Sequence, residues 1–421
     1  MTPNPAGRRT ERRGLRLWPV GTVLTLTFAI AIAVAAAVFF AGWDLLGAQG
    51  LKPERRLASG TLFDLVKLSF GVVAGAGALV ALVVAYRRQR VDEDGALRDA
   101  TRLHTERFTT AVSQLGNESA AVRLGGVHAL AGLADDAPTR ALRQTAIDVL
   151  CAYLRLPYTA EADLPSGDAD AQHAYLALRE VRHTVIRLIR DHLRLTPEHP
   201  HSWQGHDLDF TGVIFDGGDF SNAVFSDGVV SFSGAVFSNG VVSFSGAQFS
   251  GGVVDFSSAV FSGGMINFLH AEFTGGTVSF SGARLSGGGI NFFGAGFSGG
   301  TVYFSVVFSD GVVSFSGARF SGGMIYFSSA QFVGSVVDFS NAVFCGGEVR
   351  FRAAFSNGVI DFSHARFVGN TADFLYAEFS GGTVDFSHAG GVAPTGLVPS
   401  VGQPLPTGMT LPQEWYPPTH A

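Results

Sequence analysis

The sequence predicts a β-solenoid that follows an α-helical connector and a two-helix transmembrane hairpin. Phenylalanines recur from Phe210 to Phe386, at first five residues apart and then at alternating intervals of seven and five. A twelve-residue unit copied about thirteen times is the signature of a solenoid. Ahead of it, apolar residues return at helical spacing, and two longer apolar runs lie near the amino terminus.

The first apolar run, residues 20–41, contains no charged residue. Trp18 and Trp43 flank it, as indole rings do at the level of lipid headgroups. A cleaved signal peptide is the rival interpretation, but the run is longer than a signal core and no small-residue cleavage site precedes Trp43. We expect a transmembrane helix here, as half of a hairpin over residues 18–90.

The second apolar run covers residues 68–86. Lys67 precedes it and can snorkel toward the headgroups, and the arginine cluster 87–90 follows it. Gly71 and Gly75 form a GxxxG pattern, which favours close helix approach within the hairpin or between protomers of a homo-oligomer. The alternative is that the two glycines have no packing role, because small residues are common in transmembrane helices in general.

The basic residues predict the orientation of the hairpin. The segment 1–17 is rich in arginine and the cluster 87–90 follows the second run, so both ends are expected in the cytoplasm. The intervening loop also holds Lys52, Arg55 and Arg56, which weakens the contrast. The expected location is the cell membrane, multi-pass, with both termini and the solenoid cytoplasmic.

Residues 91–200 are expected to form a connector of amphipathic helices. The first carries an apolar face between Phe108 and Leu115, and the fourth covers about 171–195. The helix starts and breaks are marked by Asn117, Ser119, Asp135, Asp136, Pro138 and Pro157.

The fourth connector helix has a basic face, made of Arg179, Arg182, Arg187, Arg190 and Arg194. Such a face fits anionic lipid, nucleic acid or the acidic solenoid. It also fits a solvated surface on a helix that covers the first coil. Before residue 206 there are 24 Lys and Arg against 20 Asp and Glu. Residues 206–390 have 5 Lys and Arg against 14 Asp and Glu, a net charge of −9. This charge distribution is compatible with all four interpretations of the basic face.

Alternation along the short strands predicts which side chains point inward. In the unit around Phe244 the inward residues are Val242, Phe244, Ala247 and Phe249, and the outward ones are Ser243 and Gln248. Glycine pairs form the corners. The GxGxxG-like strings that they create are turns rather than phosphate-binding loops because no helix follows them.

The five-residue period in DLDFTGVIFDGGDFSNAVF, with Ala223, Phe225 and Ser226 as one motif, resembles the pentapeptide-repeat proteins. The resemblance covers residues 207–390 and implies a right-handed β-helix of square cross-section, here within 201–390, in a variant with two extra residues at alternate corners. Residues 20–205 are similar to the hairpin and helices of actinobacterial pentapeptide-repeat membrane proteins, judged by RFTTAVSQLG, AVRLGGVHALAGLA and VLCAYLRLPY.

The length of one coil is left open by the sequence. Coils of 24 residues give a rod of about 32 Å, and flatter coils of 12 residues give about 65 Å. Two units, at Phe304 to Phe308 and at Phe351 to Phe355, are one residue short and could lie on the same side of the solenoid.

No catalytic, cofactor-binding or metal-ligating residue is assigned, and we expect no enzyme. One set of polar residues repeats at an interval of 24 residues: Asp361 and His364, then Asp385 and His388. The set is either a weak metal site or a pair of outward positions copied by duplication of the repeat. Cys151 and Cys345 stand apart and are expected to be free thiols in a reducing compartment.

Three functions are weighed. The first is a membrane-anchored scaffold, with the lipid bilayer and an unidentified protein as partners. The second is a DNA mimic that modulates an enzyme such as gyrase, and the third is an extracellular adhesive β-helix if the topology is inverted. Direct nucleic-acid binding is not expected. The proline-rich tail, residues 391–421, is expected to be disordered or extended.

Overall fold

The computed structural model describes residues 20–45, 59–369, 371–398 and 403–416. The chain forms two compact units, Met1–Ala100 and Thr101–Ala421, which are described separately. The basic segment 1–17, Trp18 and the loop with Lys52 lie outside the described residues, so the expectations that rest on them stay expectations.

The first unit consists of α1 (Val20–Leu45) and the amino-terminal part of α2 (Ser59–Leu115). Within the described residues, one helix is long and apolar enough to cross a membrane, and it lies in α2 over Leu62–Leu115. The second apolar run and the first connector helix, which we expected to be separate, belong to this one helix. Pairs at i and i+4, such as Arg102 with Glu106 at 3.0 Å, support it between the two apolar segments.

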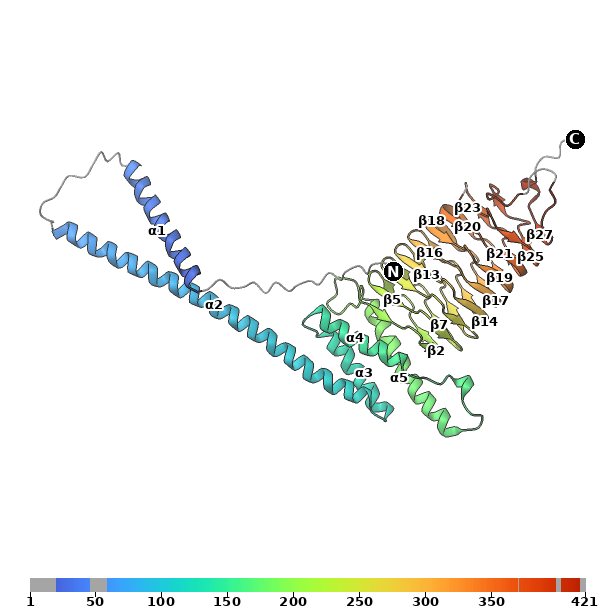
Figure 1. Ribbon diagram of the computed structural model, residues 1–421, viewed down its shortest axis with the longest axis horizontal. Coiled ribbons are helices and arrows are strands. Elements are labelled where there is room, and N and C mark those ends of the chain that lie inside the picture. The colour runs from blue at the N-terminus through green and yellow to red at the C-terminus, as the bar shows by residue number, and fades with distance from the viewer. Residues whose placement is uncertain (1–19, 46–58, 370, 399–402, 417–421) are drawn as a thin grey trace, which may run out of the picture. The chain divides into compact units, whose positions relative to one another are not determined.

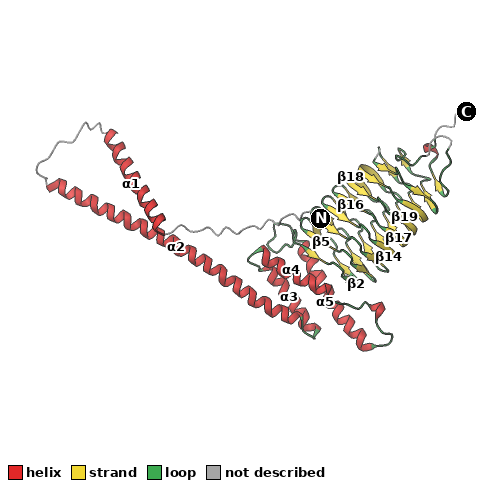
Figure 2. Cartoon of the chain, in the orientation of Figure 1, coloured by secondary structure: helices red, strands yellow, loops and turns green. Residues whose placement is uncertain are grey.

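The connector helices are α3 (Ala120–Asp135), α4 (Arg140–Arg155), the short η1 (Glu161–Asp163) and α5 (Ala169–Leu193). The breaks match the residues expected to cause them. Ser119 occupies the N-cap position of α3, but its side chain accepts no capping hydrogen bond. Asn117 instead accepts a hydrogen bond from the Ser119 amide at 2.9 Å. Figures 1 and 2 show α4 and α5 against the first coil of the solenoid.

The solenoid is built from parallel strands in two sheets, which form opposite walls (Figure 2). The first sheet contains β1 (Leu208–Asp209), β4 (Val224–Phe225), β5 (Val229–Ser231), β8 (Gln248–Phe249), β9 (Val253–Asp255), β12 (Glu272–Phe273), β13 (Thr277–Ser279), β15 (Gly296–Phe297), β16 (Thr301–Tyr303), β18 (Arg319–Tyr326), β20 (Val343–Arg350), β22 (Arg366–Phe367), β23 (Ala372–Asp373) and β26 (Gly390–Gly391). The second contains β2 (Ile214–Phe215), β3 (Gly218–Asp219), β6 (Val236–Phe237), β7 (Val241–Ser243), β10 (Val260–Phe261), β11 (Met265–Asn267), β14 (Arg284–Asn291), β17 (Val307–Ser314), β19 (Gln331–Asp338), β21 (Ala354–Asp361), β24 (Glu378–Phe379), β25 (Thr383–Asp385) and β27 (Met409–Thr410).

The strand register identifies the longer of the two coils. Val230 pairs with Val254, and Val254 pairs with Val278, so that one coil takes 24 residues. The 12-residue alternative is wrong because neighbouring units lie on opposite walls and do not pair. Repeated pairing of this kind gives about eight turns between β1 and the bridge from Asp373 to Thr395.

The core is four columns of stacked phenylalanine rings, and Leu285 replaces a ring between Phe261 and Phe308 in one of them. Rings in successive coils have centroids 4.5–5.2 Å apart. The inward set predicted around Phe244 is buried, and Ser243 and Gln248 point outward, as expected. Phe304 and Phe351 belong to one column, with Phe327 between them, so the two short units do share a side.

The tail differs from the expectation of disorder over residues 403–416. Trp415 is 7% exposed, packs on Phe367 and Phe386, and donates a hydrogen bond from Nε1 to the Gly391 carbonyl at 3.0 Å. Strand β27 pairs with β25. The physical reason is that the last coil exposes a layer of phenylalanine, which the returning tail covers.

Candidate functional site

The outer surface of the second sheet carries a column of exposed aliphatic side chains. Val312, Val336 and Val359 lie in register in successive coils and are 51%, 42% and 47% exposed. Gly289 occupies the same position one coil earlier, and the two coils before that hold the exposed Met265 and Val241. Apolar residues on a solvent-facing sheet do not stabilise the core, so this column is a candidate contact surface.

A column of carboxylates runs beside it, and it contains two of the residues that we considered for a metal site. Asp338 pairs with Asp361, and Asp361 pairs with Asp385. Asp361 accepts a hydrogen bond from the Ser363 amide at 2.6 Å, and Asp385 accepts one from the Ser387 amide at 2.8 Å. Each carboxylate therefore holds the turn that follows its strand, which is an ordinary role for aspartate.

The two histidines of that set stack on each other. His364 and His388 have ring centroids 4.9 Å apart, and both are exposed at the same corner. Among the described residues no group of three or more His, Cys, Asp or Glu is arranged to hold a metal ion. The structure thus brings each histidine together with its copy one coil away, as the 24-residue spacing predicted.

The opposite wall carries aromatic and cationic side chains over the same coils. Tyr303 stacks on Tyr326 with centroids 5.4 Å apart, and the Arg350 guanidinium lies over the Tyr326 ring at 5.4 Å. On the same wall, Arg319 of β18 and Arg366 of β22 are exposed. The repeat pattern did not indicate a role for these residues. The signal was present as large outward side chains where most units have Ser, Asp or Asn.

The basic face of α5 is directed at the solenoid. Arg182 is buried and donates to the carbonyls of Leu154 and Ile214, each at 2.7 Å. Arg190 pairs with Asp219, and Arg194 donates to the Ser221 carbonyl at 2.7 Å. The helix does cover the first coil, and contact with the acidic solenoid is confirmed for Arg190. The solvated surface is wrong for the buried Arg182, whereas Arg194 is exposed although it contacts the first coil. Arg187 is exposed.

Asp216 is the most enclosed carboxylate at this junction, with 4% of its surface exposed. It accepts hydrogen bonds from the hydroxyls of Tyr158 and Tyr175, and its other oxygen lies 3.4 Å from His183 Nε2. Burial acts to raise the pKa of Asp216, but the hydrogen bonds from His183 and the two tyrosines outweigh it and hold this pKa well below its usual value. Burial and the same carboxylate raise the pKa of Tyr175 to about 12.

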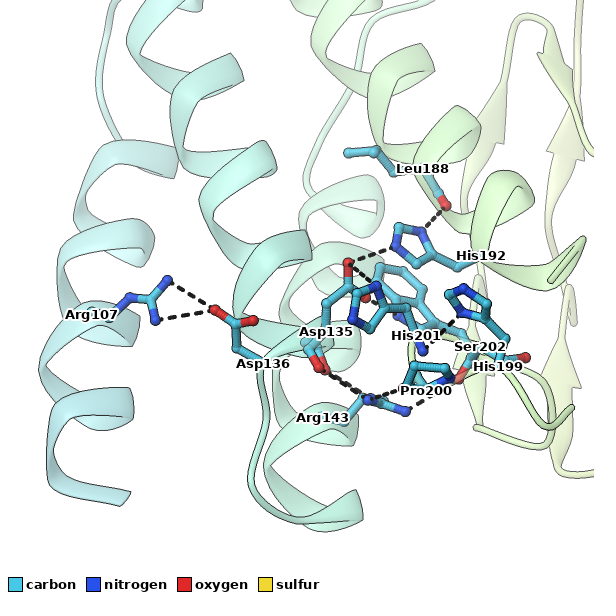
Figure 3. A network of polar contacts seen from close by, with 12 residues as sticks. Arg107, Asp135, Asp136, Arg143, Leu188, His192, His199, Pro200, His201 and Ser202 are labelled. Atoms are coloured by element: carbon cyan, nitrogen blue, oxygen red, sulfur yellow. Dashed lines mark hydrogen bonds and ion pairs between the residues drawn. The ribbon is translucent and has the colours of Figure 1, made fainter. Parts of the chain in front are cut away.

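A second polar network ties the connector helices together (Figure 3). Asp135 lies 3.1 Å from His192 Nε2 and accepts a hydrogen bond from Trp203 Nε1 at 3.3 Å. Arg107 bonds Asp136 across the α2–α3 turn, and Arg143 donates to the carbonyls of Ala134 and Pro200 (Figure 3). Each partner is committed to a structural contact, so this network is a joint between helices.

The remaining residues from the sequence analysis have simpler surroundings. Among the described residues of the chain, nothing lies within 4 Å of a Cβ added at Gly71 or Gly75, so the close contact expected within the hairpin is not formed there. Contact between protomers at these glycines stays a prediction. Cys151 is buried, and burial raises the pKa of its thiol to about 12. Cys345 is half-buried in β20, and both cysteines are free.

Parallel coils, four stacked aromatic columns and capped ends define a β-solenoid protein with an α-helical amino-terminal cap. A family model described as pentapeptide repeats (9 copies) matches residues 210–260 and 232–284. Residues 210–284 of the solenoid therefore carry pentapeptide repeats, as the resemblance implied. Searches of curated proteins and of solved structures gave no significant match.

Proposed function

We propose that the protein is a membrane-anchored, multi-pass scaffold that binds a protein partner through the outer face of its solenoid and performs no catalysis. Helices α1 and α2 form the transmembrane hairpin, and both termini and the solenoid are cytoplasmic. We also propose that the chain is of the actinobacterial membrane-protein type and that its repeat is a twelve-residue variant of the pentapeptide repeat.

The observation that carries the binding function is the exposed aliphatic column of the second sheet. Burying an exposed valine against a partner contributes about 1 kcal/mol or more, whereas leaving it in water contributes nothing to folding. Parallel coils repeat such a side chain at intervals of about 4.8 Å. A partner therefore meets a flat, regularly spaced apolar stripe flanked by Asp338, Asp361 and Asp385.

Support for the anchor comes from the exposed side chains of α2. Its apolar side chains are largely exposed: the exposed fraction is 72% for Leu68, 71% for Phe70 and 70% for Val73. Among the described residues, only 6% of the apolar window of α2 is buried, and an apolar helix with so little protein cover favours lipid as its neighbour.

The topology is tested by reporter fusions at Arg90 and at Ala421. Both fusions are expected to be active as cytoplasmic reporters, because each flank of the hairpin carries its arginine cluster on the same side. A secreted or periplasm-active reporter at either point contradicts this and revives the extracellular adhesive function.

The partner site is tested by affinity purification of the solubilised full-length chain with mass spectrometry of the proteins that co-elute. Val336→Asp with Val359→Asp is expected to lower recovery of a specific partner at least tenfold, since each change places a charge in the apolar stripe. Gln248→Asp, on an exposed position of the other wall, is the matched control and should leave recovery unchanged. Equal recovery with all variants contradicts the proposed surface.

A further inference from the structure

The two walls of the carboxy-terminal half of the solenoid differ in charge. We call the outer surface of β17, β19, β21, β24 and β25 the aspartate–valine face. Its strands hold five carboxylates and no Lys or Arg, a net charge of −5. We call the outer surface of β16, β18, β20, β22, β23 and β26 the arginine–tyrosine face. Its strands hold three Arg and two carboxylates, a net charge of +1.

Both faces also offer uncharged contact area. The aspartate–valine face has its aliphatic column, and the arginine–tyrosine face has the stacked Tyr303 and Tyr326 beside Met324, which is 43% exposed. Tyrosine, arginine and methionine are enriched where proteins meet. Because Tyr303, Tyr326 and Arg350 already stack on one another, little side-chain entropy is lost when they are covered.

We propose that the solenoid binds a second copy of the same chain, whose aspartate–valine face packs side by side against the arginine–tyrosine face of the first. This inference rests on the proposed function, because it assigns a partner to the same scaffold surface. Opposite charge and matching apolar columns bring the faces together. The contact is heterologous, so each copy keeps one free face and the chains form rows or closed rings.

Side-by-side packing brings equivalent coils of the two copies level with each other. In this arrangement the two solenoid axes run parallel and in the same direction. The two faces occupy the same coils, since β18 and β19 follow each other directly along the chain. Arg319 and Arg366 of one copy therefore lie level with the column of Asp338, Asp361 and Asp385 of the next, whereas Arg350 is already paired with Glu348 on its own strand.

The small area of the contact predicts that anchoring in the membrane increases association of the solenoids. A strand of eight residues spans about 26 Å, and four coils span about 19 Å, so one face offers about 500 Å². A standard interface buries about 800 Å² per partner. The solenoids should consequently associate weakly when free and more completely when the membrane raises their effective concentration.

Cysteine cross-linking of the full-length chain tests the inference. The background is Cys345→Ser, because Cys345 is half-buried on the arginine–tyrosine wall whereas Cys151 is 1% exposed and inaccessible. One version carries Met324→Cys and a differently sized version carries Val336→Cys. Both are placed in phosphatidylcholine vesicles and, in parallel, in detergent, and are treated with a short bis-maleimide.

Mixing the two versions is expected to give a cross-link between the different chains that exceeds the like-with-like products about tenfold. Arg319→Glu with Arg366→Glu should lower this yield about fivefold, as expected for two exposed ion pairs, and high salt should also lower it. Arg284→Glu is the matched control: it makes the same charge change on the exposed surface of the second sheet and should not lower the yield.

Three results overturn the inference. The first is that only monomers are found, and the second is that cross-links between identical versions are in excess. The third is that dimers form without a link between the two introduced cysteines, which is what contact through Gly71 and Gly75 would produce. Attachment of the arginine–tyrosine face to lipid would appear as binding to anionic vesicles with no cross-link and would also overturn it. Vesicle flotation reports anchoring separately, so failure of the membrane proposal and failure of self-association are distinguishable.

Discussion

An outward aspartate in this solenoid serves the turn that follows its strand. Asp255 accepts a hydrogen bond from the Ser257 amide at 2.9 Å, and the Ser257 hydroxyl also donates to it. Ser257 is half-buried and hydrogen-bonded, so it is not a solvated position. The next residue, Ser258, is exposed and has a φ of 58°, a conformation that Asp tolerates.

Replacing the inward Phe256 by aspartate is expected to collapse its coil. Phe256 is 0% exposed and stacks on Phe232 and Phe280, so an unpaired carboxylate there costs at least about 4 kcal/mol. Ser258→Asp introduces the same side chain at a solvated corner and should change stability by about 0.5 kcal/mol or less. Urea unfolding midpoints and limited proteolysis compare the two variants; equal sensitivity would disprove the inward assignment.

At the scale of elements, both ends of the solenoid are covered by segments that have no repeat pattern. Helices α4 and α5 cover the first coil with arginines that pair with Asp209 and Asp219. The tail covers the last coil through Trp415. Open ends of a stacked array expose apolar surface and unpaired strand edges, which favours capping elements at both ends.

Trp415→Ala is expected to open the last coil. Removing a buried tryptophan costs about 3–5 kcal/mol, and in a repeat array that cost falls on the coil next to the change. Hydrogen exchange should speed up around Val384, and binding of a hydrophobic dye should rise as Phe367 and Phe386 become accessible. Tyr416→Ala, at a residue 47% exposed, is the control and should behave as the unchanged chain. Identical exchange in all three proteins would argue against a capping role.

For the whole molecule, the cap reduces the negative charge that the solenoid presents. Of its fourteen carboxylates, Asp209, Asp216 and Asp219 are paired with Arg155, Arg179 and Arg190. The remaining eleven carboxylates and five arginines leave a net charge of −6 on the open surface. Over the roughly 38 Å that eight coils span, this is one charge per about 6 Å, whereas duplex DNA has one per about 1.7 Å.

The unit Thr101–Ala421 is therefore expected not to inhibit DNA gyrase. This fragment keeps both caps, which a fragment limited to residues 201–390 would lose. A supercoiling assay over a range of salt concentrations measures the effect, with a heat-denatured sample as control. Potent inhibition that weakens as salt increases would make DNA mimicry, through the denser column around Asp361, the better function.

Local pattern was enough to predict much of this architecture. The phenylalanine period identified the solenoid, the alternation around Phe244 predicted its buried side, and the breaks at Asp135 and Pro157 predicted the helix ends. These features depend on residues a few positions apart, where backbone geometry alone relates spacing to direction. The stacked pair His364 and His388 followed from the same period.

Other features were decided only by tertiary structure. Coils of 12 and of 24 residues place the phenylalanines inward equally well, and only pairing between distant strands, such as Val230 with Val254, distinguishes them. The arginines of α5 are equally suited to water and to carboxylates until the first coil lies against them. Trp415 lies outside the repeats, so no periodic pattern indicates its burial. It is part of the core because the last coil of the solenoid ends nearby with an apolar layer, which the tail covers.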